Sequence, residues 1–222
     1  MIKLNSNESP FGPSPKAIAA MQAAVAQGNR YPDDNATELR DRLAAVHQVQ
    51  PDHVLITAGL TDFIAILCRA LLERGLNAVT SQRSFIAYSV STKAAGAELI
   101  EAPMQNDAFD LEAITSAIND NTRIVFLANP NNPTGTLFEA NALDRFLTQV
   151  PDGVTVVVDE AYYNYANYFA EQRRVCYSHS IDYLQARQCP GSAHVLQGAW
   201  TRRSPSRLRF RQPGIAEQAG AN

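Results

Sequence analysis

The chain has 222 residues, of which 45% are hydrophobic and 18% charged, and its formal net charge is −3. This composition describes an ordinary globular protein. No apolar run approaches the roughly 18 residues of a membrane span, and no apolar stretch follows Lys3, as it would in a signal peptide. The three cysteines are widely spaced and give neither a disulfide framework nor a zinc pattern. We therefore expect a cytoplasmic protein with reduced cysteines and no membrane partner.

Helical and strand patterns alternate along the first 180 residues. The first helix is predicted over residues 17–26, with Ser14 as its cap and Pro15 at its first position. Further helices are predicted over residues 37–47, 62–73, 85–95, 111–118 and 139–149. Strands are predicted over residues 54–57, 78–80, 97–102, 123–128 and 154–158. This order predicts an α/β fold, in which helices flank a three-layer, mostly parallel sheet.

The composition changes near residue 187. Residues 1–186 carry 13 Lys+Arg and 21 Asp+Glu, whereas residues 187–222 carry six arginines and a single acid, Glu217. Pro, Arg, Ser, Gln and Gly dominate this end, and neither structural period is present, so it cannot offset its ordering entropy by burial. We therefore predict three segments: an arm and helix over 1–35, a main domain over 36–183, and a non-native or disordered basic tail over 184–222.

Two motifs follow neighbouring buried strands. Asn129–Gly135 has the sequence NPNNPTG, and Val158–Tyr162 has the sequence VDEAY. Ligands of open α/β sheets bind at the carboxyl ends of strands. Asp159 is either a structural cap or a carboxylate that faces a buried cation such as a pyridinium nitrogen. Asn132 is either a turn former or a positioned amide donor to an anionic oxygen.

Three further features carry weaker signals. Gly59 lies between a strand and a helix start, where free N–H groups and the helix dipole attract phosphate, although most such turns bind nothing. Phe85 and Tyr88 lie on a stretch that is more often core than ligand contact. Tyr162 follows Asp159 closely enough to share a site with it, but a surface helix or loop would explain it equally well.

These motifs resemble a known family. Residues 1 to about 183 resemble the amino-terminal half of the class I/II, fold-type I pyridoxal-phosphate-dependent aminotransferases, and most closely the histidinol-phosphate subgroup. The opening Leu4–Ser14, and Arg30–Asp33 followed by Leu39-Arg40, are similar to segments of that subgroup. Aromatic and cobyrinate-pathway relatives share this opening. The resemblance implies an incomplete large domain of fold type I and a homodimer that takes a small-molecule amino donor and a 2-oxo acid.

The resemblance also implies roles for single residues around the cofactor ring. Asp159 would pair with the pyridine nitrogen, and Asn132 and Tyr162 would hydrogen-bond the phenolic oxygen. Tyr88 would stack on the ring. Family members usually carry a proline before the stacking segment, whereas this chain has the sequence SQRS at residues 81–84.

Around the cofactor phosphate and the substrate, the resemblance implies a second group of residues. The N–H groups of Leu60 and Thr61, after Gly59, would bind the phosphate, although small or polar residues are usual at position 60. Tyr31 would reach the phosphate in the partner subunit. Asn7 would lie where the family closes over its substrate.

One expected residue is absent. The family needs a lysine downstream of the aspartate strand to hold pyridoxal phosphate as a Schiff base, but the chain has no lysine after Lys93. We therefore predict no catalytic residue and an inactive chain, which also lacks the small domain. With synonymous codons, reading residues 187–207 one nucleotide later can give ASALVLRTFSKAHGLAGLRLG, which holds the family's Ser-Lys motif. We infer a frameshift between about Tyr183 and Arg187.

Two other classes of protein are weighed against this reading. A non-enzymatic binding module could use the basic tail to contact nucleic acid, but Trp200 and Phe210 are the only aromatic residues of residues 187–222 and no nucleic-acid motif is present. A Rossmann enzyme would need a Gly-x-Gly-x-x-Gly sequence after a strand, which the chain lacks. We therefore expect no nucleic-acid partner.

Overall fold

The computed structural model describes residues 6–173, 177, 193–196 and 199–202. The chain divides into two compact units, Met1–Thr37 and Glu38–Asn222. The first unit holds α1 (Pro15–Val25), in which the Ser14 hydroxyl accepts a hydrogen bond from the Ala17 N–H group at 3.2 Å and Pro15 occupies the first turn. Helix α2 (Thr37–His47) begins at the boundary between the units.

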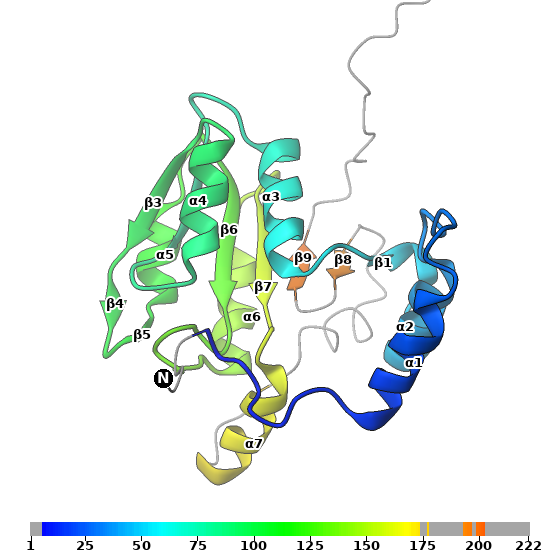
Figure 1. Ribbon diagram of the computed structural model, residues 1–222. Helices are drawn as coiled ribbons and strands as arrows, with labels where there is room; N and C mark the ends of the chain where they lie inside the picture. The colour runs from blue at the N-terminus through cyan, green and yellow to red at the C-terminus, as the bar shows by residue number, and fades with distance from the viewer. Residues whose placement is uncertain (1–5, 174–176, 178–192, 197–198, 203–222) are drawn as a thin grey trace, which may run out of the picture. The chain divides into compact units, whose positions relative to one another are not determined.

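The second unit is built on a seven-stranded sheet with the order β1-β8-β9-β7-β6-β2-β3 (Figure 1). The strands are β1 (Val54–Leu55), β2 (Asn77–Ser81), β3 (Glu98–Ala102), β6 (Thr122–Ala128), β7 (Thr155–Asp159), β8 (Ala193–Leu196) and β9 (Ala199–Arg202). Strands β3, β2, β6 and β7 are parallel neighbours. Strand β9 is antiparallel to both β7 and β8, and β8 is parallel to β1. Consequently β1 runs in the same direction as β7, and the carboxyl ends of β1, β2, β6 and β7 share one edge.

Helices cover both faces of this sheet. Helix α3 (Leu60–Leu71) packs with α4 (Ile86–Ala94), and α5 (Leu111–Ala117) packs with α6 (Ala140–Gln149) on the opposite face (Figure 1). A 3₁₀ turn (Pro51–His53) precedes β1, and α7 (Tyr163–Arg173) follows β7. These layers confirm the predicted three-layer α/β fold with a mostly parallel sheet.

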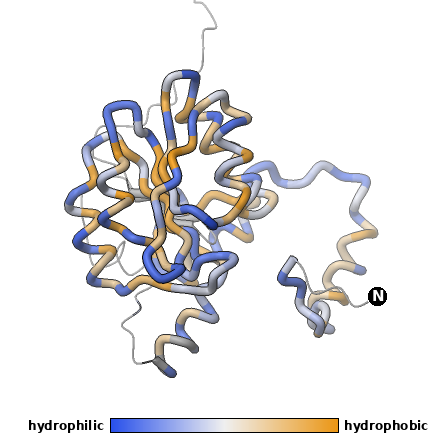
Figure 2. The backbone as a smooth tube through the Cα atoms, turned by 90° about the vertical axis from the view of Figure 1, so that its left-hand side faces the viewer, coloured by the Kyte–Doolittle hydropathy of each residue, from blue (hydrophilic) through white to orange (hydrophobic). Residues whose placement is uncertain are grey.

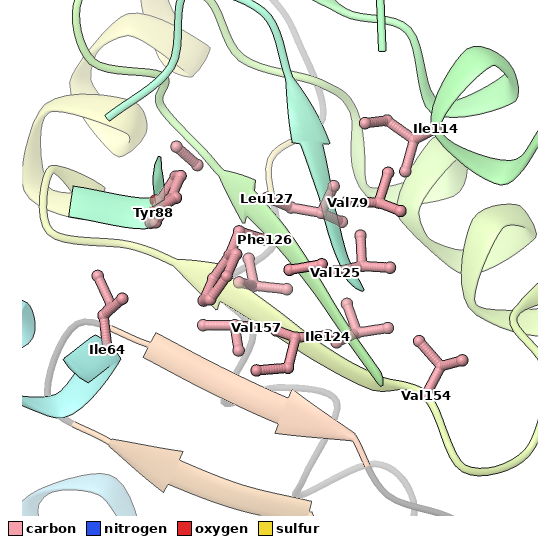
Figure 3. Close-up of a cluster of buried hydrophobic side chains, with 14 of the residues drawn as sticks. Ile64, Val79, Tyr88, Ile114, Ile124, Val125, Phe126, Leu127, Val154 and Val157 are labelled. Atoms are coloured by element: carbon pink, nitrogen blue, oxygen red, sulfur yellow. The ribbon is translucent and has the colours of Figure 1, made fainter. Parts of the chain in front are cut away.

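The core lies around the two central strands. Every residue of β7 is buried, and so is every residue of β6 except Arg123, as expected for parallel strands covered on both faces. Phe126 points to the side of Tyr88 and Ile64, and Val125 to the side of Ile114 (Figure 3). Figure 2 shows the same organisation as hydrophobic colour concentrated along the sheet strands. Full burial of side chains of this size stabilises the fold by about 1.5–3 kcal/mol each.

Apart from shifts of a few residues at element ends and the 3₁₀ turn before β1, the predicted elements differ from the structure in three places. A short hairpin of β4 (Met104–Gln105) and β5 (Ala108–Phe109) was not predicted, and its turn residues Asn106 and Asp107 have positive φ angles of 51° and 59°. The segment after Tyr162, left open between helix and loop, forms α7.

The third difference concerns the tail. Strands β8 and β9 lie within residues 184–222, the segment predicted to be a non-native or disordered tail, and that description of the segment stays a prediction. Pairing with β9 satisfies the backbone groups on an edge of β7 that would otherwise be open. The other tail residues lie outside the described part of the chain. Within the described residues, no helix is long and apolar enough to cross a membrane.

Candidate functional site

Asp159 is the last residue of β7, and its side chain is only 6% exposed. Both carboxylate oxygens are held: the Tyr88 hydroxyl donates to Oδ2 at 2.5 Å, and the Ala161 N–H group donates to Oδ1 at 3.0 Å. Burial raises the pKa of Asp159 from 3.8 to about 6. The two hydrogen bonds oppose this rise, and the neighbouring Glu160 carboxylate adds to it. Asp159 is therefore a buried carboxyl group with two fixed hydrogen-bond donors.

Tyr88 lies on α4 with no exposed surface. Its ring stacks on Phe126, with ring centroids 4.7 Å apart and planes 3° apart. Burial, followed by the charge of Asp159 and the hydrogen bond to it, raises the pKa of Tyr88 well above its ordinary value of 10. The hydroxyl therefore keeps its proton and acts as the donor. This placement gives no support to the stacking role predicted for Tyr88, because the ring offers no open face to a ligand.

Phe85 is the aromatic side chain of this segment with exposed surface. It is half-buried at the N-terminal end of α4, and its ring meets Tyr88 edge-on at 5.7 Å and 89°. The sequence contained this signal, since Phe85 and Tyr88 are three positions apart on one stretch, but it did not indicate which ring is covered.

The NPNNPTG loop begins beside Asp159. Ala128, at the end of β6, pairs in register with Asp159, and the Asn129 N–H group donates to the Asp159 carbonyl at 2.9 Å. The Asn129 side chain closes the loop, because it accepts from the Phe138 N–H group at 3.0 Å and donates to the Phe138 carbonyl at 3.3 Å. The loop therefore starts and returns at a fixed point of the sheet edge.

Asn131 anchors the middle of this loop, a role that the sequence analysis missed. It is 2% exposed, accepts a hydrogen bond from the Ser84 hydroxyl at 2.9 Å, and donates to the Arg83 carbonyl at 3.1 Å and to the Thr134 hydroxyl at 2.9 Å. Asn132 is half-buried, and within the described part of the chain its amide has no hydrogen-bond partner. The loop thus holds one asparagine rigidly and leaves the next one open to a ligand.

The Gly59 turn lies at the same edge of the sheet, where β1 ends, with β8 and β9 between it and β7. Gly59 has a φ angle of +88°, which residues other than glycine rarely adopt. It is the N-cap residue of α3, and because it has no side chain it makes no capping hydrogen bond. The N–H groups of Leu60 and Thr61 are in the first turn of α3 and have no acceptors inside the helix. Asp62 turns back and accepts from the Ala58 N–H group at 3.1 Å.

The segment after Asp159 carries a second buried acid. Glu160 is 3% exposed and accepts a hydrogen bond from the Tyr177 hydroxyl at 2.9 Å. Tyr162 is half-buried in the turn before α7, where its ring lies 6.4 Å from that of Tyr165. Tyr162 lies three positions after Asp159 in the chain, and its predicted contact with a ligand stays a prediction.

Asn7 and Tyr31 belong to the first compact unit. Asn7 has a positive φ angle of 51°, and the Tyr31 side chain is fully exposed. Their predicted roles toward substrate and partner subunit stay predictions.

The comparison with protein families decides which family this site belongs to. The model for "Aminotransferase class I and II" matches residues 1–185. The chain belongs to this family. Among the curated relatives of this aminotransferase chain is histidinol-phosphate aminotransferase 2 of Pseudomonas fluorescens, which is 48% identical over 166 residues, or 75% of this chain and 45% of the relative. The aromatic amino acid aminotransferase of Thermobifida fusca is 47% identical over 163 residues, or 73% of this chain and 45% of the relative. The chain thus spans about half the length of these relatives.

Solved structures agree with the family. Histidinol-phosphate aminotransferase from Sinorhizobium meliloti, in complex with pyridoxal 5′-phosphate, superposes with a TM-score of 0.74 at 25% identity, over 90% of this chain and 55% of the other. The putative histidinol-phosphate aminotransferase from Erwinia carotovora atroseptica gives a TM-score of 0.74 at 29% identity, over 91% and 60% of the two chains.

The residues of the sheet edge fit a pyridoxal phosphate. A buried acid with a raised pKa, Asp159, suits a protonated ring nitrogen, and the open amide of Asn132 suits an anionic oxygen. The first turn of α3 suits a phosphate. The described residues contain no group of three or more His, Cys, Asp or Glu that could hold a metal ion.

Proposed function

We propose that the second unit forms the cofactor-holding part of a pyridoxal-phosphate-dependent aminotransferase of the histidinol-phosphate type. The observation that carries this proposal is Asp159, a carboxylate held at both oxygens yet buried at the carboxyl end of β7. Burying an ionised carboxylate costs free energy unless it has a partner. A cationic ligand would offset that cost. The similarity to histidinol-phosphate aminotransferases supports the choice of reaction type.

The side chains and backbone groups of the site would each bind a different part of the cofactor. Asp159 would accept a hydrogen bond from the ring N–H group, and Asn132 and Tyr162 would hydrogen-bond the phenolic oxygen. The backbone N–H groups of Leu60 and Thr61 would bind the phosphate. When bound, pyridoxal phosphate supplies the electron sink that makes the substrate's α-proton acidic.

We assign the ring contact to Phe85 rather than to Tyr88. Phe85 has exposed surface at the start of α4, whereas the Tyr88 ring is covered by Phe126 and its hydroxyl is bound to Asp159. An aromatic face can exclude water from one side of a flat ligand only if part of it is exposed.

For the whole protein, we propose transfer of an amino group from a small amino donor to a 2-oxo acid in a cytoplasmic homodimer. Tyr31 would reach the phosphate site of the partner subunit, and Asn7 would close over the substrate. Both residues lie in the first unit, which precedes the sheet in the chain.

The 222-residue chain has no lysine after Lys93, so no lysine follows Asp159 that could hold the cofactor covalently and move the α-proton. We propose that a frameshift between about Tyr183 and Arg187 has replaced this lysine, and that residues 187–222 are non-native. The DNA sequence over codons 180 to 225 tests the idea: a lysine motif in another frame supports it, and its absence from every frame contradicts it.

Turnover tests the activity of the chain directly. Purified 222-residue chain is mixed with pyridoxal phosphate, histidinol phosphate and 2-oxoglutarate, and glutamate formation is compared with a protein-free blank that contains the same cofactor. We expect no excess over the blank, because loss of the covalent nucleophile removes many orders of magnitude of rate. Turnover above the blank would mean that another group replaces the lysine.

A further inference from the structure

We propose that the β4–β5 hairpin is a positioning element for Asn132: the backbone carbonyl of its turn residue Asp107 holds the NPNNPTG loop through the Thr136 hydroxyl. This inference rests on the proposed function, because it concerns how the same site presents an amide to the phenolic oxygen. The hairpin acts through the loop and needs no contact with the ligand. The groups that join the hairpin to the loop, which we call the hairpin–loop network, belong to Arg83, Asp107, Asn131, Thr134 and Thr136.

A chain of hydrogen bonds leads from Asn131 to the hairpin. The Asn131 amide donates to the Thr134 hydroxyl at 2.9 Å, and Thr134 Oγ1 lies 2.8 Å from Thr136 Oγ1. The Thr136 hydroxyl donates to the Asp107 carbonyl at 2.9 Å. A hydroxyl has one proton, and since Thr136 gives its proton to Asp107, Thr134 must donate to Thr136. All bonds of the chain therefore run from the loop to the hairpin, an arrangement in which successive hydrogen bonds strengthen one another.

The hairpin is a suitable fixed point for this chain of bonds. Its strands β4 and β5 are antiparallel, and its turn residues Asn106 and Asp107 both have positive φ angles, as in two-residue type I′ turns. Phe109 on β5 is buried, and its ring centroid lies 6.3 Å from that of Phe138, where the loop returns to the sheet edge. The hairpin therefore contacts the loop at two places, at its base and at Thr136.

The ion pair of the hairpin–loop network contributes less than its hydroxyl bonds. Arg83 Nη2 lies 2.8 Å from Asp107 Oδ1, but the two side chains are 63% and 62% exposed. Ion pairs of this kind are weak because water screens the charges. Thr134 and Thr136 are half-buried and Asn131 is buried, so water competes less with their hydrogen bonds. The bond between the Thr136 hydroxyl and the Asp107 carbonyl is therefore the place at which to interrupt the network.

Asn132 depends on this network because its own amide has no hydrogen-bond partner among the described residues. The Asn131 N–H group donates to the Thr136 carbonyl at 2.8 Å, and the Gly135 N–H group donates to the Asn131 carbonyl at 2.8 Å. The turn that carries Asn132 is thus closed onto Thr136. A loosened Thr136 loosens Asn132 as well, and a ligand must then order the amide when it binds, which lowers affinity.

Binding of pyridoxamine 5′-phosphate, which needs no lysine, tests the network in the full 222-residue chain. Thr136→Val keeps the β-branched shape and removes the hydroxyl. The matched control is Thr115→Val, which removes another half-buried threonine hydroxyl, bonded to the Leu111 carbonyl at 2.8 Å. We expect Thr136→Val to weaken binding by about threefold to tenfold, and Thr115→Val to bind as the unmodified chain does. Equal affinities of the two variants would overturn the proposal.

The same substitution in a chain without the Asn132 amide separates positioning from general damage. Once Asn132→Ala is in place, no amide remains to be positioned, so adding Thr136→Val should weaken binding by less than about twofold. A merely structural role of Thr136 would give the same loss with and without the amide. That result would also overturn the proposal.

Amide hydrogen exchange without cofactor distinguishes failure of this inference from failure of the proposed function. The Asn131 and Gly135 N–H groups report on the loop, and the Phe138 N–H group, bonded to Asn129 Oδ1 at 3.0 Å, reports on its base. We expect Thr136→Val to speed exchange in the loop by about threefold or more and to leave the base unchanged. Unchanged exchange at all three groups would overturn the proposal. If loop exchange speeds up but the unmodified chain does not bind pyridoxamine phosphate, the proposed function fails and the hold of the hairpin on the loop stands.

Discussion

Replacing Asp159 with asparagine should stabilise the protein at neutral pH and change how its stability depends on pH. Burial raises the pKa of this acid from 3.8 to about 6, so the folded protein binds a proton there more tightly than the unfolded chain does. The wild-type protein therefore loses stability as pH rises through this window, and most of the loss is complete a little above pH 6. Asparagine has the same size and no charge, so it removes this loss.

The size of the effect follows from the two pKa values. The interval from 3.8 to about 6 corresponds to about 3 kcal/mol, at about 1.4 kcal/mol per pH unit. Between about pH 5 and about pH 8, the advantage of Asp159→Asn over the wild-type chain should grow by about 1.4 kcal/mol. Other titrating groups cancel in this difference because both proteins contain them.

Urea denaturation followed by circular dichroism at several pH values measures this difference in the free energy of unfolding. Asp144→Asn, at an exposed position on α6, controls for the loss of one negative charge. The reasoning would be refuted if the difference between Asp159→Asn and wild type stayed constant from about pH 5 to about pH 8, or shrank.

Three further substitutions give sharp expectations. Gly59→Ala should lower the free energy of unfolding by about 1 kcal/mol or more. A methyl group at position 59 would meet no atom within 4 Å, so the cost comes from the φ angle of +88° alone. An unchanged urea midpoint would contradict this. Asp110→Ala removes the cap that accepts from the Glu112 and Ala113 N–H groups, and should cost about 1 kcal/mol in the same assay, whereas Asp110→Asn should cost less. Asn132→Ala should leave the unfolding free energy within about 0.5 kcal/mol of wild type, because the amide has no partner among the described residues, yet weaken pyridoxamine phosphate binding; unchanged binding would remove Asn132 from the site.

The sheet was predictable because its strands carry strong local signals. β6 and β7 are continuous apolar runs that end at polar motifs, and this pattern predicted both their burial and the position of Asp159 at a strand end. The β4–β5 hairpin was missed because each of its strands has two residues, too few for a period-two pattern to be recognised.

Helix α4 shows why the role of Tyr88 could not be predicted. Its exposed side carries Ile86 and Val90, while Ser91 and Thr92 are buried with Tyr88. This inverts the usual amphipathic pattern, so the sequence did not indicate which aromatic ring faces the core. The choice depends on a tertiary contact between α4 and β7, 71 positions apart in the chain, which no local pattern records.

The most direct test of the account is the affinity of the full 222-residue chain for pyridoxamine 5′-phosphate, measured by fluorescence titration near pH 7 beside the Asp159→Ala variant. Asp159→Ala removes the acceptor of the ring N–H group and leaves the Gly59 turn and the Asn132 loop in place. The account predicts saturable binding by the unmodified chain and a loss of about tenfold or more in the variant, because hydrogen bonds to charged groups contribute about 1.5–3 kcal/mol. No saturable binding by the unmodified chain, or equal binding by both proteins, would contradict a cofactor site built on Asp159.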